Sequence, residues 1–294
     1  MRIPRPEYPR PDLRRGREEG RDWLNLNGPW LFAFDPGDEG LGAEWQHRPN
    51  EAFPTTLLVP FPWESPAAWG QDRERRDWNE EFLVREAYLD PGGVGMDNYR
   101  TAERHTIGWY RRTVTIPESW RGRPVFLNFG AVDHHATVFV NGIRLGEHEG
   151  GYTPFGFDIT GALGETGPAV ITVRAQDPQD HRDQPAGKQI HWYQRTSGIW
   201  QTVYLEPRGL CYVEQVHARP DVDAEAVEFR IWLGGDEIPG ATVEVTVVDP
   251  DEAEAGRVSA AASVGEVLRV GLGLPDVTLW DIDAPALYRA QVCV

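Results

Sequence analysis

Hydrophobic and polar residues alternate in short runs from residue 23 to about residue 207, and glycines and prolines separate these runs. A period of two places apolar side chains on one face of a β-strand, whereas a helix would repeat them every 3.6 residues. Strands are expected at Trp109–Ile116, Val125–Phe129, Ala136–Val140, Ala169–Ala175 and Gln201–Leu205. Many short strands with turns between them predict an all-β fold, in which two sheets pack as a sandwich.

The pair Asn141-Gly142 is the strongest local signal in this region. A two-residue hairpin turn requires a positive φ at both central positions, and Asn followed by Gly meets that requirement at low cost. Apolar residues alternate on both sides of the pair, in ATVFV and in IRLGE. The sequence therefore predicts a β-hairpin with its turn at Asn141-Gly142.

A second set of strands follows the segment EPRG at 206–209, which we interpret as a domain boundary. These strands are expected at Tyr212–Ala218, Ala226–Leu233, Ala241–Asp249, Val267–Leu272 and Leu287–Val294. Val243, Val245 and Val247 share one face of their strand, as in a sandwich core. We expect three parts: an extended Pro/Arg-rich arm at 1–22, a first sandwich at 23–207, and a second sandwich at 208–294 that lacks its final strand.

The formal net charge of −17 argues against nucleic acid and anionic membrane surfaces as partners, because both would repel this chain. Neither a secretory signal nor an apolar stretch long enough for a membrane helix is visible, so we expect a cytoplasmic protein. Cys211 and Cys293 are expected to be buried free thiols. His134 and His135 alternate across a strand, so they cannot bind one metal, and we expect both to be exposed. No metal site and no cofactor is expected.

Three stretches together resemble a known family. They are AVDHHATVFVNGIRLGEHEGGYTPFGFDIT at 131–160, GWYRRTVTIP before it and SGIWQTVYLEP after it. This combination resembles the N-terminal sugar-binding domain of family 2 glycoside hydrolases, the group of β-galactosidases, β-glucuronidases and β-mannosidases. LWDIDAPALYRAQV near the C-terminus is similar to the next domain of that family. The resemblance covers residues 23–294 and implies a jelly-roll sandwich followed by an immunoglobulin-like sandwich.

The family hydrolyses β-linked terminal sugars with retention, through two glutamates at strand ends of a (β/α)₈ barrel. Such a barrel takes about 250 residues of alternating strand and helix, a pattern that this sequence does not contain. Asn50-Glu51 and Asn79-Glu80 match the asparagine-glutamate pair of the family's acid, but both lie in polar loops. We therefore expect no catalytic residue here, no activity of this chain alone, and a catalytic barrel as its partner.

The resemblance implies that loops of the first domain contact the sugar. Asp133 begins a strand at a position where the family often holds an acidic or polar residue; it either binds sugar hydroxyls or caps backbone N–H groups, and we favour the second. The loop QDHRDQPAGKQIHWYQRTSGIW resembles the family's PRGKQ segment, with Ala in place of the Arg. It supplies five further candidates for sugar contact: Lys188, Gln189, His191, Trp192 and Arg195. The alternative for this loop is packing against the barrel.

Three hypotheses for function follow. The first is the non-catalytic N-terminal part of a retaining exo-β-glycosidase, which completes the pocket for a β-linked saccharide. The second is a stand-alone carbohydrate-binding module, which would bind saccharide without a barrel. The third is a purely structural role, in which the sandwiches brace a barrel or form the interface of a homo-oligomer. The sequence does not name the sugar.

Overall fold

A computed structural model describes residues 22–65, 67–69, 106–164, 167–178, 196–263 and 265–294. The chain divides into two compact units, 1–207 and 208–294. Strands form both units, and the helices among the described residues are single 3₁₀ turns: η2 (Trp45–His47), η3 (Asn50–Ala52), η5 (Glu118–Trp120) and η6 (Thr160–Ala162). The all-β sandwich architecture predicted from the sequence is confirmed.

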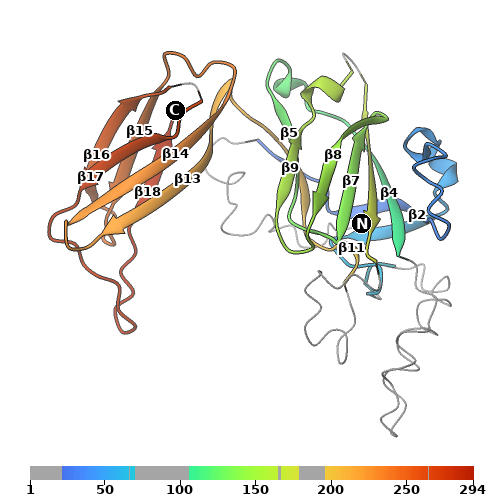
Figure 1. Ribbon diagram of the computed structural model, residues 1–294, viewed down its shortest axis with the longest axis horizontal. Helices are drawn as coiled ribbons and strands as arrows, with labels where there is room; N and C mark the ends of the chain where they lie inside the picture. The colour runs from blue at the N-terminus through green and yellow to red at the C-terminus, as the bar shows by residue number, and fades with distance from the viewer. Residues whose placement is uncertain (1–21, 66, 70–105, 165–166, 179–195, 264) are drawn as a thin grey trace, which may run out of the picture. The chain divides into compact units, whose positions relative to one another are not determined.

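The described residues of the first unit form two larger antiparallel sheets (Figure 1). The six-stranded sheet has the order β3 (Thr55–Val59), β2 (Gly28–Phe34), β4 (Ile107–Val114), β10 (Ala169–Gln176), β7 (His135–Val140) and β8 (Ile143–Glu149). The four-stranded sheet has the order β1 (Leu24–Asn25), β12 (Val203–Pro207), β5 (Val125–Phe129) and β9 (Phe155–Asp158). A short pair, β6 (Val132–Asp133) with β11 (Gly198–Ile199), forms a further sheet among these residues.

Alternation along the strands fills the space between the two sheets with large apolar side chains. Trp30, Phe32 and Tyr110 from the six-stranded sheet meet Leu127 and Phe129 from the four-stranded one, and all five are at most 1 % exposed. Apolar burial of this size is the main stabilising contribution to a folded domain. The described residues that follow β3 add two more buried tryptophans, Trp63 and Trp69, to this core.

The predicted hairpin is present, because β7 and β8 are joined at Asn141 and Gly142, whose φ angles are 50° and 81°. The side chain of Asn141 also makes two hydrogen bonds. Its amide donates to the carbonyl of Ala162 (2.9 Å) and accepts from the backbone N–H of Val170 (2.8 Å). The hairpin turn is therefore tied to two neighbouring segments.

The outer face of the six-stranded sheet carries a second apolar cluster, which includes Phe53, Trp109 and Phe139. The segment that follows β2 covers this face and carries Phe53 over Trp109, so both faces of β4 are buried. Trp109 and Phe139 stack with ring centroids 6.0 Å apart.

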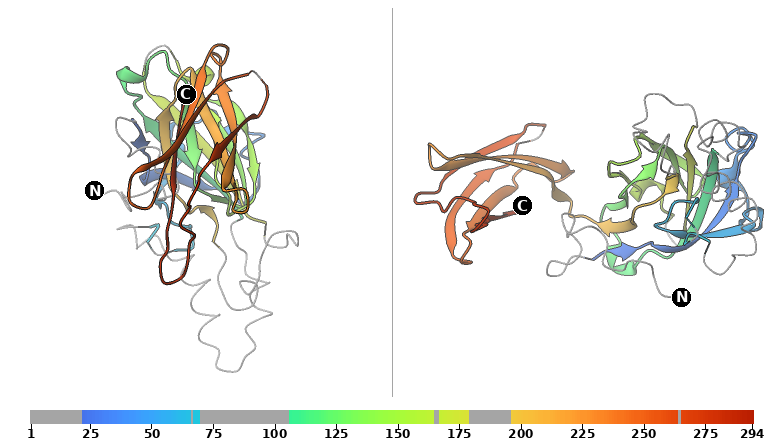
Figure 2. Two further views of the ribbon diagram at one scale, coloured as in Figure 1. Left: turned by 90° about the vertical axis from the view of Figure 1, so that its left-hand side faces the viewer. Right: turned by 90° about the horizontal axis from the view of Figure 1, so that it is seen from below.

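The described residues of the second unit form two three-stranded antiparallel sheets, which are seen from two further directions in Figure 2. The first has the order β13 (Cys211–Asp221), β14 (Ala226–Gly235) and β17 (Leu268–Gly273); the second has the order β16 (Glu254–Ala261), β15 (Thr242–Val248) and β18 (Arg289–Cys293). Val243, Val245 and Val247 point into its core, as their alternation predicts.

Cys211 and Cys293 are free thiols, as expected, but neither is buried. Cys293 is exposed, like most side chains of β18, which is the end strand of its sheet among the described residues. Among the described residues, no helix is long and apolar enough to cross a membrane.

Candidate functional site

Asp133 lies where β6 pairs with β11, with Gly198 as its partner in register. Its side chain is buried, and the hydroxyl of Thr196 donates a hydrogen bond of 3.4 Å to its Oδ2. Gly151 packs directly against the carboxylate, because a Cβ built at Gly151 would lie 2.4 Å from the Asp133 Cγ. Position 151 therefore admits a glycine only, unless the carboxylate moves.

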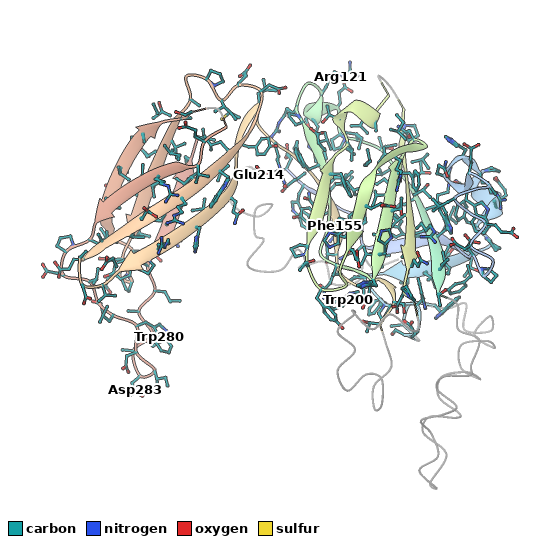
Figure 3. All side chains as sticks on the ribbon, viewed as in Figure 1. Arg121, Phe155, Trp200, Glu214, Trp280 and Asp283 are labelled. Atoms are coloured by element: carbon teal, nitrogen blue, oxygen red, sulfur yellow. The ribbon has the colours of Figure 1, made fainter. Side chains whose placement is uncertain are left out.

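Two aromatic side chains lie next to Gly151, the residue that packs on this carboxylate. Trp200 follows β11, and its Nε1 donates to the carbonyl of Gly151 at 2.7 Å. Tyr152 meets the Trp200 ring edge-on, with centroids 5.6 Å apart and planes at 70°. Figure 3 shows Trp200 at one end of the strands of the first unit. An aromatic surface beside a few well-placed polar groups is the combination that sugar sites use, since ring faces pack on C–H groups while polar atoms bind hydroxyls.

Trp200 was not among the residues predicted to contact sugar. The sequence contains it only within the family-like stretch SGIW, where nothing separates a sugar-facing tryptophan from a core one. What identifies it is the hydrogen bond to Gly151, which places it against the loop that packs on Asp133.

The other five predicted contact residues, Lys188, Gln189, His191, Trp192 and Arg195, lie outside the described residues. Their roles stay predictions. The chain enters the described part again at Thr196, the residue whose hydroxyl contacts Asp133.

A second polar group lies next to this site, and no motif of the sequence indicated it. The Ser197 hydroxyl oxygen is 2.5 Å from Oε1 of Glu64 and 2.6 Å from Oδ2 of Asp177. The backbone N–H of Ser197 also donates to Oε2 of Glu64 at 3.0 Å. Although part of the Glu64 side chain reaches the surface, burial of its carboxyl group raises its pKa to about 7.

Glu64 and Asp177 do not form a glycosidase acid–nucleophile pair, although two carboxyl groups about 5 Å apart are what a retaining enzyme requires. Ser197 occupies the space between them, and Ser197 and Asp177 are both buried. No sugar ring fits between the two groups. The pair therefore has a structural role.

Of the two asparagine-glutamate pairs, the structure describes Asn50-Glu51. Asn50 lies in η3, and its Oδ1 accepts a hydrogen bond of 2.8 Å from Nε of the buried Arg111. Asn79-Glu80 lies outside the described residues. Asn50 therefore has a structural partner, and the absence of a catalytic residue stays a prediction.

The expectation that His134 is exposed was wrong. His134 is buried, and its Nε2 lies 3.5 Å from Oε1 of Glu149 on β8. His134 lies between β6 and β7, where its backbone N–H donates to the carbonyl of Gln176, so strand alternation does not apply to it. Within the described ranges, no group of three or more His, Cys, Asp or Glu is arranged to hold a metal ion.

Comparisons with known proteins find a matching family model and relatives of this chain. A family model described as "Glycosyl hydrolases family 2, sugar binding domain" matches residues 24–208. The chain is 25 % identical over 277 residues to a β-galactosidase of Thermoanaerobacter pseudethanolicus, with 93 % of this chain and 33 % of that protein covered. It is 27 % identical over 302 residues to the β-glucuronidase of Felis catus, with 93 % and 40 % covered.

Solved structures show the same fold. A β-glucuronidase from an uncultured Clostridium species superposes with a TM-score of 0.65 and 22 % identity, over 94 % of this chain and 43 % of that chain. The Bifidobacterium dentium β-glucuronidase in complex with coumarin-3-O-glucuronide gives a TM-score of 0.64 and 22 % identity, over 92 % and 45 %. The chain thus spans between a third and a half of the length of these relatives.

Proposed function

Because this chain belongs to glycosyl hydrolase family 2 and contains the sugar binding domain of that family, we propose that it is the non-catalytic part of a retaining exo-β-glycosidase. In this proposal it supplies sugar contacts to a pocket whose reacting carboxylates lie elsewhere. The observation that carries the proposal is the juxtaposition of the Asp133 carboxylate with the Tyr152–Trp200 pair around Gly151. An acidic acceptor beside an aromatic face fits a β-linked saccharide.

Calorimetric titration with methyl β-D-galactoside, β-D-glucuronide and β-D-mannoside tests the proposal. We expect saturable binding in the micromolar to millimolar range without hydrolysis. Asp133→Asn should weaken it roughly tenfold to hundredfold, because a hydrogen bond to a charged acceptor is lost. Trp200→Ala should weaken it by a similar factor. Asp223→Asn, an exposed change in the second unit, is the matched control.

Hydrolysis of a chromogenic β-glycoside above background would contradict the proposal, since it would require reacting carboxylates within this chain. Binding that survives both Asp133→Asn and Trp200→Ala would place the sugar elsewhere.

The loop between β17 and β18 favours a second, compatible role in assembly with a further part of such an enzyme. Four large apolar side chains of this loop are exposed: Leu279 (58 %), Trp280 (59 %), Ile282 (82 %) and Leu287 (71 %). Figure 3 shows that Trp280 and Asp283 lie on a loop that projects from the second unit. Exposed apolar patches rimmed by polar residues are typical of docking surfaces.

This role predicts that the loop contributes little to the stability of the chain itself. Trp280→Ser combined with Ile282→Ser should leave the free energy of unfolding within about 0.5 kcal/mol of wild type, because both side chains face solvent. The variant should also self-associate less in sedimentation velocity. Ile231→Ser, at a buried position of the same unit, should unfold it. A loss of stability in the loop variant comparable to that of Ile231→Ser would assign the loop to the core.

A further inference from the structure

One serine hydroxyl lies between two carboxyl groups beside the proposed sugar site. Ser197 Oγ is 2.5 Å from Oε1 of Glu64 and 2.6 Å from Oδ2 of Asp177. Both distances are those of short hydrogen bonds between oxygen atoms. The three residues come from separate parts of the chain: Glu64 follows β3, Asp177 follows β10, and Ser197 precedes β11.

The number of protons on these three side chains determines whether both contacts of the Ser197 hydroxyl are hydrogen bonds. A serine hydroxyl has one proton to donate, and an ionised carboxylate has none. The hydroxyl therefore donates to one carboxyl group, and its contact with the other is a hydrogen bond only if that second carboxyl carries a proton. Two contacts of this length require one additional proton in the cluster.

Glu64 is the residue that holds this proton. Burial of its carboxyl group raises its pKa to about 7, and the negative charge of Asp177 acts in the same direction. Among the residues that the structure describes, the titratable groups that interact with Glu64 are Asp177 and Tyr110, which lies on β4. Neither is a cation, so neither favours the ionised form of Glu64.

The cluster holds Ser197 on two sides and so sets the position of β11. The Ser197 N–H donates to Glu64, and the Ser197 carbonyl accepts from the backbone N–H of Trp63 at 3.2 Å. Gly198, the next residue, pairs with Asp133, and Trp200 follows at the end of the strand. A displacement of Ser197 therefore moves the residues that form the proposed sugar site.

We propose that a proton held by Glu64 completes a chain of hydrogen bonds through the Ser197 hydroxyl to the Asp177 carboxylate, and that this shared proton keeps β11 in the position that sugar binding at Asp133 and Trp200 requires. Glu64 and Asp177 are thus positioning residues. The sugar-binding part of this inference rests on the proposed function, whereas the shared proton does not.

The raised pKa of Glu64 determines how the stability of the fold changes with pH. The carboxyl of Glu64 takes up its proton near pH 4.5 when unfolded and near pH 7 when folded. The stabilisation is complete below about pH 4.5, is lost progressively as the pH rises to about 7, and changes no further above that. Over this window the folding equilibrium constant should fall on the order of a hundredfold through this group alone.

Unfolding by urea at pH 4.5 to 8.5 tests the shared proton on the full chain. Glu64→Gln is the decisive variant, because its amide donates to Ser197 as the protonated acid does and does not ionise. We expect the difference in unfolding midpoint between Glu64→Gln and wild type to grow between pH 4.5 and 7 and then stay constant. Glu51→Gln, an exposed change in the same unit, should follow wild type at every pH. Identical pH profiles for Glu64→Gln and wild type would overturn the proposal.

Two further measurements test the proposal independently of the unfolding experiment. The infrared spectrum of the wild type should contain the carbonyl band of a protonated carboxyl at pH 6 that disappears above pH 8; its absence at pH 6 would overturn the proposal even if Glu64→Gln failed to fold. Titration with methyl β-D-galactoside should show affinity falling roughly tenfold from pH 5.5 to 8.5 in wild type and staying constant in Glu64→Gln. Absence of binding in every variant would contradict the proposed function, while the unfolding and infrared data would still decide for or against the shared proton.

Discussion

Replacing Gly198 by alanine is expected to unfold the first unit or to bring it close to unfolding. Gly198 has a φ of +82°, and an added Cβ would lie 2.1 Å from the hydroxyl oxygen of Tyr110 and 2.8 Å from the Trp63 ring. Tyr110 and Trp63 are both buried, so neither ring has space to retreat. A positive φ costs alanine about 1–2 kcal/mol, and overpacking adds roughly 1–3 kcal/mol. The total is a large fraction of the stability of a typical domain.

Urea unfolding followed by tryptophan fluorescence measures this effect. Gly161→Ala is the matched control, because nothing lies within 4 Å of its added Cβ and its φ is not positive. That variant should stay within about 0.5 kcal/mol of wild type. If Gly198→Ala unfolds at the midpoint of Gly161→Ala, the packing of β11 against Tyr110 and Trp63 is looser than the structure shows.

The parts of this fold that the sequence predicted depend on neighbouring residues. The turn at Asn141-Gly142 is dictated by the positive φ that both positions adopt, and the inward valines of β15 by simple alternation. β16 (Glu254–Ala261) was not expected, since its small and charged residues give a weak strand pattern. It forms because β15 offers it a paired edge.

The site was less predictable, because it is assembled from residues far apart in the chain. Asp133 was recognised from a family-like stretch, but no spacing connects Glu64 with Ser197, which follows 133 residues later. Their contact depends on where the turn after β3 and the start of β11 meet, and only tertiary structure determines that. The same holds for Gly151, whose lack of a side chain matters only because the Asp133 carboxylate lies against it.

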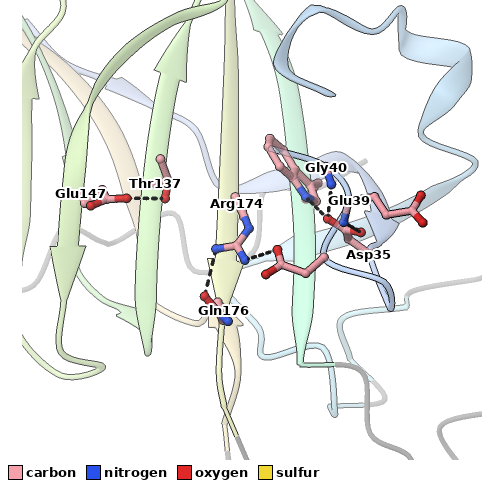
Figure 4. Close-up of polar contacts among 9 residues, drawn as sticks. Asp35, Glu39, Gly40, Thr137, Glu147, Arg174 and Gln176 are labelled. Atoms are coloured by element: carbon pink, nitrogen blue, oxygen red, sulfur yellow. Dashed lines mark hydrogen bonds and ion pairs between the residues drawn. The ribbon is translucent and has the colours of Figure 1, made fainter. Parts of the chain in front are cut away.

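Asp35→Ala is expected to destabilise the first unit by about 3 kcal/mol, because the Asp35 carboxylate satisfies three donors at once. It accepts from the backbone N–H groups of Glu39 (2.9 Å) and Gly40 (2.8 Å) and from Nε1 of Trp109 (3.1 Å). Figure 4 shows this carboxylate between the backbone of Glu39 and Gly40. Asp35 and Trp109 are buried, so water does not readily replace the lost acceptor.

Asp35→Asn separates the acceptor role from the volume of the side chain. The amide retains one oxygen acceptor but turns an NH₂ group toward a remaining donor, so we expect a loss between wild type and Asp35→Ala, with urea midpoints in that order. Asp223→Ala, exposed in the second unit, should have no effect. If Asp35→Ala retains the wild-type midpoint, the segment that covers Trp109 is held by the apolar contacts of Phe53 and Phe139 rather than by the carboxylate. The expected loss would instead show that a single buried carboxylate is needed to keep the outer face of the six-stranded sheet covered.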